Sequence, residues 1–316
     1  MSVVMVLGAN GRLGRAAALA FAQAGWRVLA QTRRAERAPW PAGVRTLQAD
    51  VLDIAALVKA ATMQGARLDL IVHALNPDYT QWARLLPPLT AAGIALAEAT
   101  RATLMLPGNV YNFGNQLPAL LTPTTPVVTS HPKARQRITL EASLASAAGR
   151  GVRSIVVRAG DFLGDTGTWM DLGLARQLGR GRVTHLGPQD VEHAWAYLPD
   201  LAQVFVRVAE QRAALPAHAV LHYAGLTLTG AQMHALIESA LGGKMKAVAF
   251  PWWLMRLAAP FAAMPRALIE MRYLWQRPHR LDERDLQRLI GEVPHTPAAE
   301  VVRRCVADLA TMASHR

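Results

Sequence analysis

The first half of the 316-residue chain alternates short apolar runs with longer segments in which apolar residues recur at helical spacing. Short continuous apolar runs are typical of strands buried on both faces, as in a parallel sheet. The pattern predicts strands at Val3–Leu7, Arg27–Gln31, Val44–Gln48, Leu68–His73, Thr103–Leu106 and Ser154–Arg158. It predicts helices at Leu13–Ala24, Ile54–Met63, Trp82–Gly93 continued by Ile94–Thr100, and Ile138–Ala148. This alternation predicts an α/β fold with a doubly wound parallel sheet.

After about residue 165 the strand–helix alternation gives way to a different pattern. Helical segments dominate there, with shorter strands expected near Arg182–His185 and His218–Tyr223. We therefore predict two regions, residues 1–165 as the main domain and residues 166–316 as a smaller, mostly helical region that is partly interleaved with it.

A glycine-rich turn joins the first predicted strand to the first predicted helix. It reads Gly8-Ala9-Asn10-Gly11-Arg12-Leu13-Gly14, with its glycines three residues apart. The first glycine permits the tight turn, the second lets backbone approach a pyrophosphate, and the third lets helix and strand pack closely. Free N–H groups at the helix N-terminus then bind the phosphates. The turn predicts a Rossmann-type domain that binds a nicotinamide dinucleotide through Gly8, Asn10, Gly11, Arg12, Leu13 and Gly14.

The spacing of these glycines resembles that of the short-chain dehydrogenase/reductase superfamily, in its extended or atypical branch of epimerase-like proteins. The segment Arg158–Gly164 looks like that family's Arg-Pro-Gly segment, and Trp195–Ala202 looks like its Tyr-Val-Asp-Asp-Val-Ala segment. The resemblance extends to about residue 210. It implies that the adenine is contacted by Asp50 and Val51, and that Ala74 and Asn76 lie beside the cofactor.

The end of the second predicted strand bears on the choice of cofactor. An NAD site usually has an acidic residue there, whereas arginine accommodates the 2′-phosphate of NADP. The chain reads Gln31-Thr32-Arg33-Arg34, with no carboxylate before Glu36, and Arg12 could add a third positive charge. We therefore expect NADP(H) to be favoured over NAD(H), with Arg33 and Arg34 at the 2′-phosphate. The alternative is that both are solvated loop residues.

The usual catalytic residues of the resembled family are absent. Its enzymes carry Ser or Thr after the fifth strand and a Tyr-x-x-x-Lys motif on the next helix, where the lysine lowers the pKa of the tyrosine. The segment Asn109–Asn112 matches the family's Val-Tyr-Gly, which places Pro107 at the serine position. Glu141 matches a family glutamate, which places Lys133 at the tyrosine position and Arg137 at the lysine position.

This departure leaves two explanations open. In the first, the active site is rewired: Tyr111, Lys133 and Arg137 gather at the nicotinamide end with Asn76 and Asn109 as hydrogen-bond partners. Lys133 is then the acid, or it activates Tyr111. In the second, chemistry has been lost and the dinucleotide pocket acts as a redox sensor. Structural alternatives are a packed aromatic for Tyr111 and a solvated helix face for the two cations.

Charge and cysteine content limit the classes of partner and the cellular compartment that we expect. The chain has 34 Lys and Arg against 22 Asp and Glu, a formal net charge of +12. No Lys/Arg-rich run occurs, so we expect a small-molecule substrate and no nucleic acid. Cys305 is the only cysteine, which favours a reducing, cytoplasmic compartment. Because the glycine loop starts at Gly8, we expect no cleavable targeting segment.

Two further features need an interpretation. Phe250–Trp275 is apolar and aromatic but interrupted by charges and prolines, so we expect no transmembrane span. We expect a packed core helix there, with a lid over a hydrophobic substrate, a dimer contact or a membrane-surface contact as alternatives. The ten histidines show no zinc spacing, so we expect no metal. His131, His185 and His193 are expected to be ordinary surface or core residues, although each could approach the pocket.

The sequence therefore predicts an NADP(H)-dependent oxidoreductase or epimerase acting at a carbonyl or secondary alcohol, with a non-standard active site and a homodimer as one expected assembly. A non-catalytic NADP(H)-binding regulator is the alternative.

Overall fold

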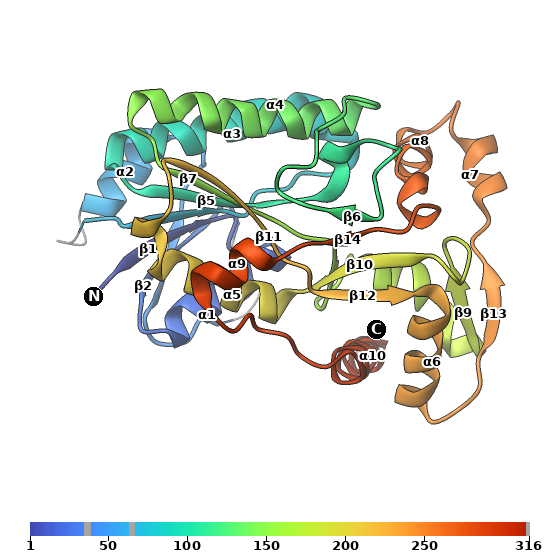
Figure 1. The fold of residues 1–316 in the computed structure, drawn as a ribbon. Helices are drawn as coiled ribbons and strands as arrows, with labels where there is room; N and C mark the ends of the chain where they lie inside the picture. Colours follow the sequence, from blue (N-terminus) through green and yellow to red (C-terminus); the bar gives the residue numbers. More distant parts are fainter. Residues whose placement is uncertain (35–38, 63–66, 314–316) are drawn as a thin grey trace.

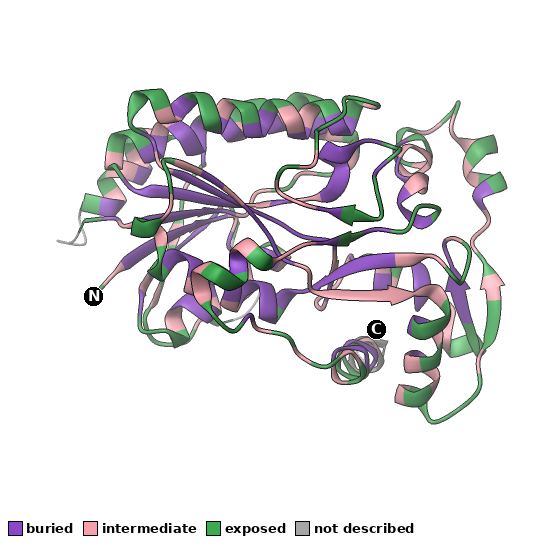
Figure 2. Cartoon of the chain, in the orientation of Figure 1, coloured by how far each residue is buried: buried purple, intermediate pink, exposed green. Residues whose placement is uncertain are grey.

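The computed structural model describes residues 1–34, 39–62 and 67–313. Its centre is a seven-stranded sheet in the order β11-β7-β5-β4-β1-β2-β3, in which every neighbouring pair is parallel. The strands are β1 (Val3–Leu7), β2 (Arg27–Thr32), β3 (Val44–Gln48), β4 (Leu70–His73), β5 (Thr103–Gly108), β7 (Ser154–Arg158) and β11 (His218–His222). The inner strands are buried almost throughout, as their continuous apolar runs predict (Figure 2).

Helices cover both faces of this sheet (Figure 1). One face packs against α1 (Arg12–Gln23), α5 (Leu198–Glu210) and α9 (Arg284–Ile290), and the other against α2 (Ile54–Thr62), α3 (Trp82–Thr100) and α4 (Pro132–Ala147). Successive residues of β1 point to opposite faces, so Val4 packs with the first layer and Met5 with the second. The predicted doubly wound α/β fold is confirmed.

The later part of the chain adds small sheets and helices beside the carboxyl edge of the central sheet. A three-stranded sheet contains β8 (Asp161–Leu163), β10 (Glu192–Tyr197) and β12 (Leu226–Thr229). Two parallel pairs join β9 (Arg182–His185) to β13 (Lys246–Ala249) and β6 (Leu120–Leu121) to β14 (Arg280–Leu281). The remaining helices are α6 (Gly230–Leu241), α7 (Trp252–Ala258), α8 (Ala263–Glu270) and α10 (Ala298–Ala313). β11 belongs to the central sheet and α5 and α9 pack on it, so segments after residue 165 share a core with the first half of the chain.

Short single-turn helices place several residues discussed below. They are η1 (Tyr79–Gln81), η2 (Val110–Phe113), η3 (Ala148–Arg150), η4 (Met170–Leu174), η5 (Leu178–Arg180), η6 (Arg212–Ala214) and η7 (Arg272–Trp275). η1 follows β4 and η2 follows β5, so both lie at the carboxyl edge of the sheet, where α/β proteins bind their ligands.

The observed elements differ from the predicted ones in two instructive places. Helix α4 begins at Pro132, not at Ile138, because proline fits the first turn of a helix and the polar residues that follow hid its periodicity. The segment Phe250–Trp275 forms two short helices and a turn, not one packed core helix, and it exposes Trp253 and Phe261. The expectation of a packed core helix was therefore wrong, because one side of this segment faces solvent. None of the described helices combines the length and hydropathy needed to cross a bilayer.

Candidate functional site

The glycine loop has the backbone geometry that its glycines predict. Gly8 ends β1 with a φ of 77°, a left-handed value that glycine adopts without strain. The N–H of Gly11 donates to the carbonyl of Gly8 at 2.8 Å, which closes the turn. A Cβ placed on Gly14 would lie 2.2 Å from that same carbonyl oxygen. Position 14 therefore accepts only glycine if α1 is to approach β1 this closely.

The N-terminus of α1 is open to an anion. Gly11 precedes the helix with no side-chain cap, and the first turn contains no acidic residue. The first N–H groups of a helix have no partner within it, and together with the helix dipole they attract negative charge. Asn10 and Arg12 flank Gly11 in sequence, whereas Leu13 is buried in the core. The Arg12 guanidinium donates to the carbonyl of Thr166 at 3.1 Å, in the loop after β8.

The end of β2 supports the loop from the side. The Gln31 amide accepts the N–H of Gly8 at 2.9 Å and donates to the carbonyl of Ala49 at 2.7 Å, so it braces the turn against β3. Thr32 has a buried hydroxyl with no hydrogen-bond partner among the described residues. Arg33 and Arg34 are exposed. Glu36 lies outside the residues that the structure describes.

The other predicted cofactor residues lie at the same edge of the sheet. Val51 is buried in the core, whereas Asp50 is exposed and its carboxylate accepts the N–H of Leu52 at 3.0 Å. Ala74 continues from β4 by donating to the carbonyl of Leu7, and its own carbonyl lies 3.4 Å from a Cβ built on Gly8. Asn76 is exposed, and within the described part of the chain no hydrogen bond joins it to Tyr111, Lys133 or Arg137.

Two tyrosines meet at the carboxyl ends of β4 and β5. The hydroxyl of Tyr111 lies 2.6 Å from that of Tyr79, and Asn109 orients η2 by accepting the N–H of Tyr111 at 3.0 Å. Burial raises the pKa of Tyr79 to about 12 and the pKa of Tyr111 well above its usual value. Both hydroxyls therefore stay protonated at neutral pH, and Tyr111 is not an activated phenol in this geometry.

The two predicted cations lie against this tyrosine pair. Lys133 is buried, and its Nζ lies 5.5 Å from the centre of the Tyr79 ring. Arg137 is also buried and donates to the carbonyl of Pro107 at 2.6 Å, while its Nε has no hydrogen-bond partner among the residues that the structure describes. Burial lowers the pKa of Arg137, although the nearby Glu141 and Tyr111 oppose that effect. The alternative of a solvated helix face for the two cations is wrong.

A carboxylate from a distant helix completes the cluster. Glu270 of α8 accepts from the Lys133 ammonium at 2.7 Å and from the Lys133 N–H at 2.9 Å, and its carboxylate lies 3.0 Å from the His131 Nδ1. Burial alone would raise the pKa of Glu270, but the hydrogen bonds from His131 and Lys133 outweigh burial and hold it at about 2. The His131 Nε2 lies 3.1 Å from the hydroxyl of Tyr273, which extends the chain of contacts.

A second buried pair lies behind the tyrosines. The Nε2 of His193 is 3.0 Å from a carboxylate oxygen of Asp161, and its Nδ1 is 3.2 Å from the carbonyl of Leu274. These two contacts, one on each ring nitrogen, hold the orientation of the imidazole. The ring stacks on Trp275 with centroids 4.0 Å apart. Asp161 also acts on the tyrosines, because its negative charge contributes to raising the pKa values of Tyr79 and Tyr111.

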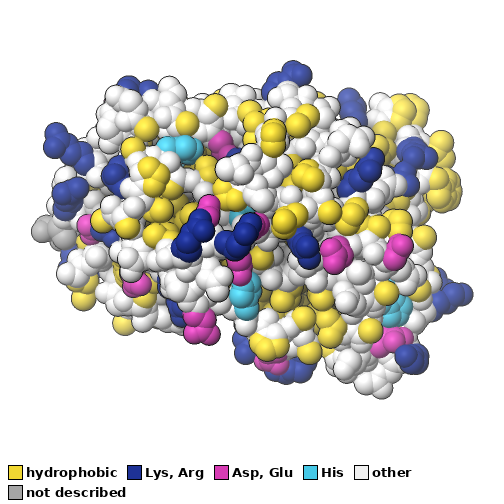
Figure 3. Space-filling view, in the orientation of Figure 1, with side chains coloured by type: hydrophobic (Ala, Val, Ile, Leu, Met, Phe, Trp, Pro, Cys, Tyr) yellow, Lys and Arg dark blue, Asp and Glu magenta, His cyan; other side chains and the backbone are white. Residues whose placement is uncertain are grey.

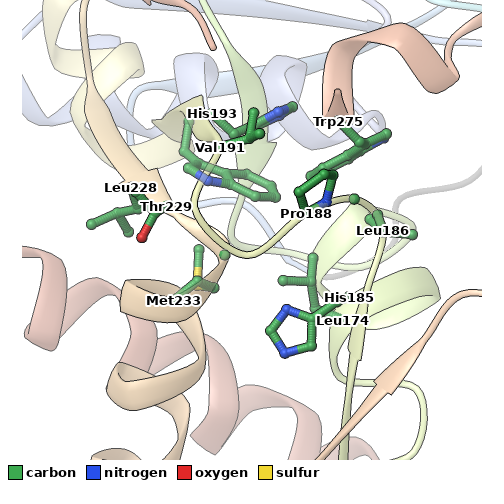
Figure 4. Close-up of a pocket in the computed structure, with 13 residues that line it drawn as sticks. Leu174, His185, Leu186, Pro188, Val191, His193, Leu228, Thr229, Met233 and Trp275 are labelled. Carbon is green, nitrogen blue, oxygen red and sulfur yellow. The ribbon is translucent and has the colours of Figure 1, made fainter. Parts of the chain in front are cut away.

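His193 and Trp275 also border a small enclosed cavity, together with His185 and Met233 (Figure 4). Its free space is about 30 Å³, which holds one or two water molecules and no substrate. His185 pairs with His234 at 2.9 Å there, and burial lowers the pKa of His185. The described residues contain no group of three metal-ligating side chains.

The structure thus brings Tyr111, Lys133 and Arg137 together, and adds residues that the sequence did not single out. These are Tyr79, Asp161, Glu270 and Tyr273. One signal was available for Glu270, which is the only acidic residue in the apolar segment 250–275. A charge retained in such a segment requires a partner. Nothing in the spacing indicated that this partner would be Lys133.

Comparisons with known proteins agree with this geometry. Residues 4–221 match the profile of the NAD dependent epimerase/dehydratase family. A UDP-glucose-4-epimerase from Stenotrophomonas maltophila, solved with NAD and formylated UDP-arabinopyranose, superposes with a TM-score of 0.76 at 15% identity and full coverage of both chains (100%). A dTDP-glucose 4,6-dehydratase from Bacillus anthracis, solved with NAD, gives a TM-score of 0.77 at 10% identity, covering 98% of this chain and 97% of its own.

The Bordetella bronchiseptica enzyme WbmH, solved with NAD+, gives a TM-score of 0.74 at 15% identity and covers 98% of this chain and 99% of its own. The comparison with curated proteins gave no match. At these identities the structural likeness concerns the fold, and the family follows from the profile match.

Proposed function

The chain belongs to the NAD dependent epimerase/dehydratase family, and on this premise we propose that it binds NADP(H) and acts on a carbonyl or secondary alcohol of a small molecule, as an oxidoreductase or epimerase. One observation carries the proposal. A pair of protonated tyrosines and a buried lysine lie at the same sheet edge as the uncapped glycine loop.

The residues around the loop fit a dinucleotide phosphate. Because Gly14 has no Cβ, α1 packs closely against the Gly8 carbonyl, and the uncapped N-terminus of the helix is available to a pyrophosphate. Arg33 and Arg34 stand where an NAD site usually has a carboxylate that accepts from the ribose 2′-OH. Their guanidinium groups suit a 2′-phosphate, because a planar fork of donors matches phosphate oxygens. These features support NADP(H) over NAD(H).

Lys133 is the proposed proton donor. When bound, the dinucleotide supplies or accepts the hydride, so the protein must supply or accept a proton at the substrate oxygen. The tyrosine hydroxyls can donate hydrogen bonds that orient this oxygen, but their raised pKa values disfavour giving up the proton. The Lys133 ammonium has three N–H donors, and its hydrogen bond to Glu270 uses one of them. The buried Arg137 guanidinium favours negative charge developing nearby.

Glu270 and His131 are proposed to return the proton. After Lys133 has protonated the substrate oxygen, its neutral amine needs a proton from solvent. The contacts Lys133–Glu270, Glu270–His131 and His131–Tyr273 are continuous, and the Glu270 side chain is 20% exposed, so this chain of contacts meets solvent at its carboxylate. Glu270 therefore has two roles in the proposal: it positions the ammonium and it passes protons.

Two measurements on the purified chain test the proposal. Calorimetric titration with NADPH and NADH should give tighter binding of NADPH, and tighter binding of NADH would overturn the NADP assignment. NADPH oxidation is then followed across a panel of aldehydes, ketones and nucleotide sugars, the last because two structural neighbours are named for such compounds. Because an epimerase returns the hydride and consumes no NADPH overall, the panel compounds are also analysed for conversion to an isomer. If NADPH binds but is never oxidised, and no panel compound is converted, the enzymatic proposal is wrong and the non-catalytic regulator is favoured.

A further inference from the structure

The helices α7 and α8 and the turn between them form an exposed apolar element, residues 252–270, which we call the α7–α8 hairpin. Its large apolar side chains face solvent: Trp253 is 62% exposed, Leu257 is 65% exposed and Phe261, in the turn, is 91% exposed. Figure 3 shows hydrophobic side chains gathered at the edge of the molecule where Figure 1 places these helices. A contiguous patch of this kind marks an interaction surface more often than chance exposure does.

The inner side of the hairpin is fixed to the rest of the protein. Trp252 is buried and its indole N–H donates to the carbonyl of Leu186 at 2.7 Å. Ala267 is buried as well, and Glu270 at the end of α8 holds Lys133. The exposed residues therefore belong to the outer face of an anchored element, and they point away from contacts that the chain itself could supply.

The charges around this face identify the partner. From Lys246 to Ile269 the sequence contains no Asp or Glu, while Arg256 and Arg266 are exposed on the two helices. Aromatic and aliphatic side chains flanked by cations fit the headgroup region of an anionic bilayer, where rings enter the interface and cations meet lipid phosphates. In a self-complementary contact between two copies, Arg256 and Arg266 of both copies would be brought together, and the segment from Lys246 to Ile269 has no acidic residue to pair with them.

We propose that the α7–α8 hairpin docks the protein on the surface of an anionic membrane. Trp253, Leu257 and Phe261 enter the headgroup layer, and Arg256 and Arg266 lie at the lipid phosphates. The docking is peripheral and does not depend on the cofactor or on catalysis. Because α8 also carries Glu270, the docked protein would hold its polar cluster close to the lipid surface.

Vesicle sedimentation with the full chain tests this proposal. The wild type should sediment with phosphatidylcholine vesicles containing 30% phosphatidylglycerol, and should sediment less with phosphatidylcholine alone or at high salt. The double variant Trp253→Ser/Phe261→Ser should partition at least tenfold less, and Arg256→Gln/Arg266→Gln should lose the preference for the anionic lipid. Both pairs are exposed, so thermal unfolding should stay close to that of the wild type.

A matched control is Leu241→Ser, which removes an exposed leucine at the end of α6 and should leave partitioning unchanged. Sedimentation velocity on the same protein samples measures whether the chain associates with a second copy of itself. If the wild type fails to bind anionic vesicles, the proposal is overturned. If it self-associates and Trp253→Ser/Phe261→Ser abolishes that association without any effect on vesicles, the hairpin is an interface between copies and the proposal is likewise overturned.

Discussion

The glycine loop and the polar cluster lie at the same edge of the central sheet, but they are built differently. The loop is formed by the backbone of seven consecutive residues. Its geometry requires glycine at two positions, because Gly8 has a left-handed φ and Gly14 lies against a carbonyl. The cluster is made by side chains from segments up to 142 residues apart in sequence, as in the contact between His131 and Tyr273. A local backbone site can be recognised from a motif, whereas a site assembled from distant helices cannot.

This contrast predicts that changes in the cluster affect turnover and changes in the loop affect cofactor binding. The largest effect is expected for Lys133→Arg. Arginine keeps the positive charge beside Glu270 but does not release a proton at accessible pH, so the turnover of a substrate found in the panel should fall about 10²–10⁴-fold. NADPH affinity by calorimetry should change little.

Arg135→Gln, an exposed position on the same helix α4, is the control and should retain turnover. If Lys133→Arg keeps wild-type turnover, Lys133 acts only through its ion pair and is not the proton donor.

The next effect concerns the loop. In Gly14→Ala the new Cβ would meet the Gly8 carbonyl at 2.2 Å, so α1 must shift away from β1. Overpacking of this kind costs about 1–3 kcal/mol or more, and we expect NADPH affinity to fall about 100-fold, with a lower Tm. The control Gly149→Ala has no atom within 4 Å of its new Cβ and should change neither quantity. Unchanged NADPH affinity in Gly14→Ala would mean that the cofactor binds elsewhere.

The Glu270 ion pair should contribute to stability in a defined pH window. Its pKa is lowered to about 2, so the stabilisation is fully present above the ordinary pKa of a glutamate and is lost as pH falls through about 2. Glu270→Gln should therefore be less stable than the wild type by about 1–3 kcal/mol at pH 7, and the difference should shrink between roughly pH 4.5 and pH 2. Urea unfolding at several pH values measures it.

Glu98→Gln serves as the comparison, since Glu98 lies in an exposed pair with Arg150 at 3.5 Å and should show a difference near zero throughout. A difference for Glu270→Gln that does not vary with pH would contradict the role of the ionised carboxylate.

The smallest effect is expected at the end of β2. Arg33→Ala/Arg34→Ala should weaken NADPH binding about tenfold and leave NADH binding unchanged, because only NADPH carries the 2′-phosphate. Arg288→Ala, an exposed arginine of α9, should alter neither affinity. Equal weakening of both cofactors would indicate that the two arginines act through general charge or loop conformation and not through the 2′-phosphate.

The sequence alone predicted six of the seven strands of the central sheet, because each buried strand is a short apolar run. It predicted β11 as a strand of the later region, and only the structure placed it at the edge of the central sheet. β1, β3, β7 and β9 have the bounds that the pattern predicts. The sequence also located the glycine loop, since its constraint lies within the motif itself. Short strands such as β8 and β12 were not predicted, because a few residues show no distinctive period.

Tertiary structure alone decided what surrounds Lys133. Its position on α4 could be counted from Glu141, but its burial, its contact with the Tyr79 ring and its pairing with Glu270 depend on how α8 packs beside η1. Exposure of the α7–α8 hairpin was decided in the same way, since an apolar segment has the same pattern whether or not another element covers it. Hydrophobic periodicity records which residues avoid water, and only packing determines which of them are covered and which polar groups become partners.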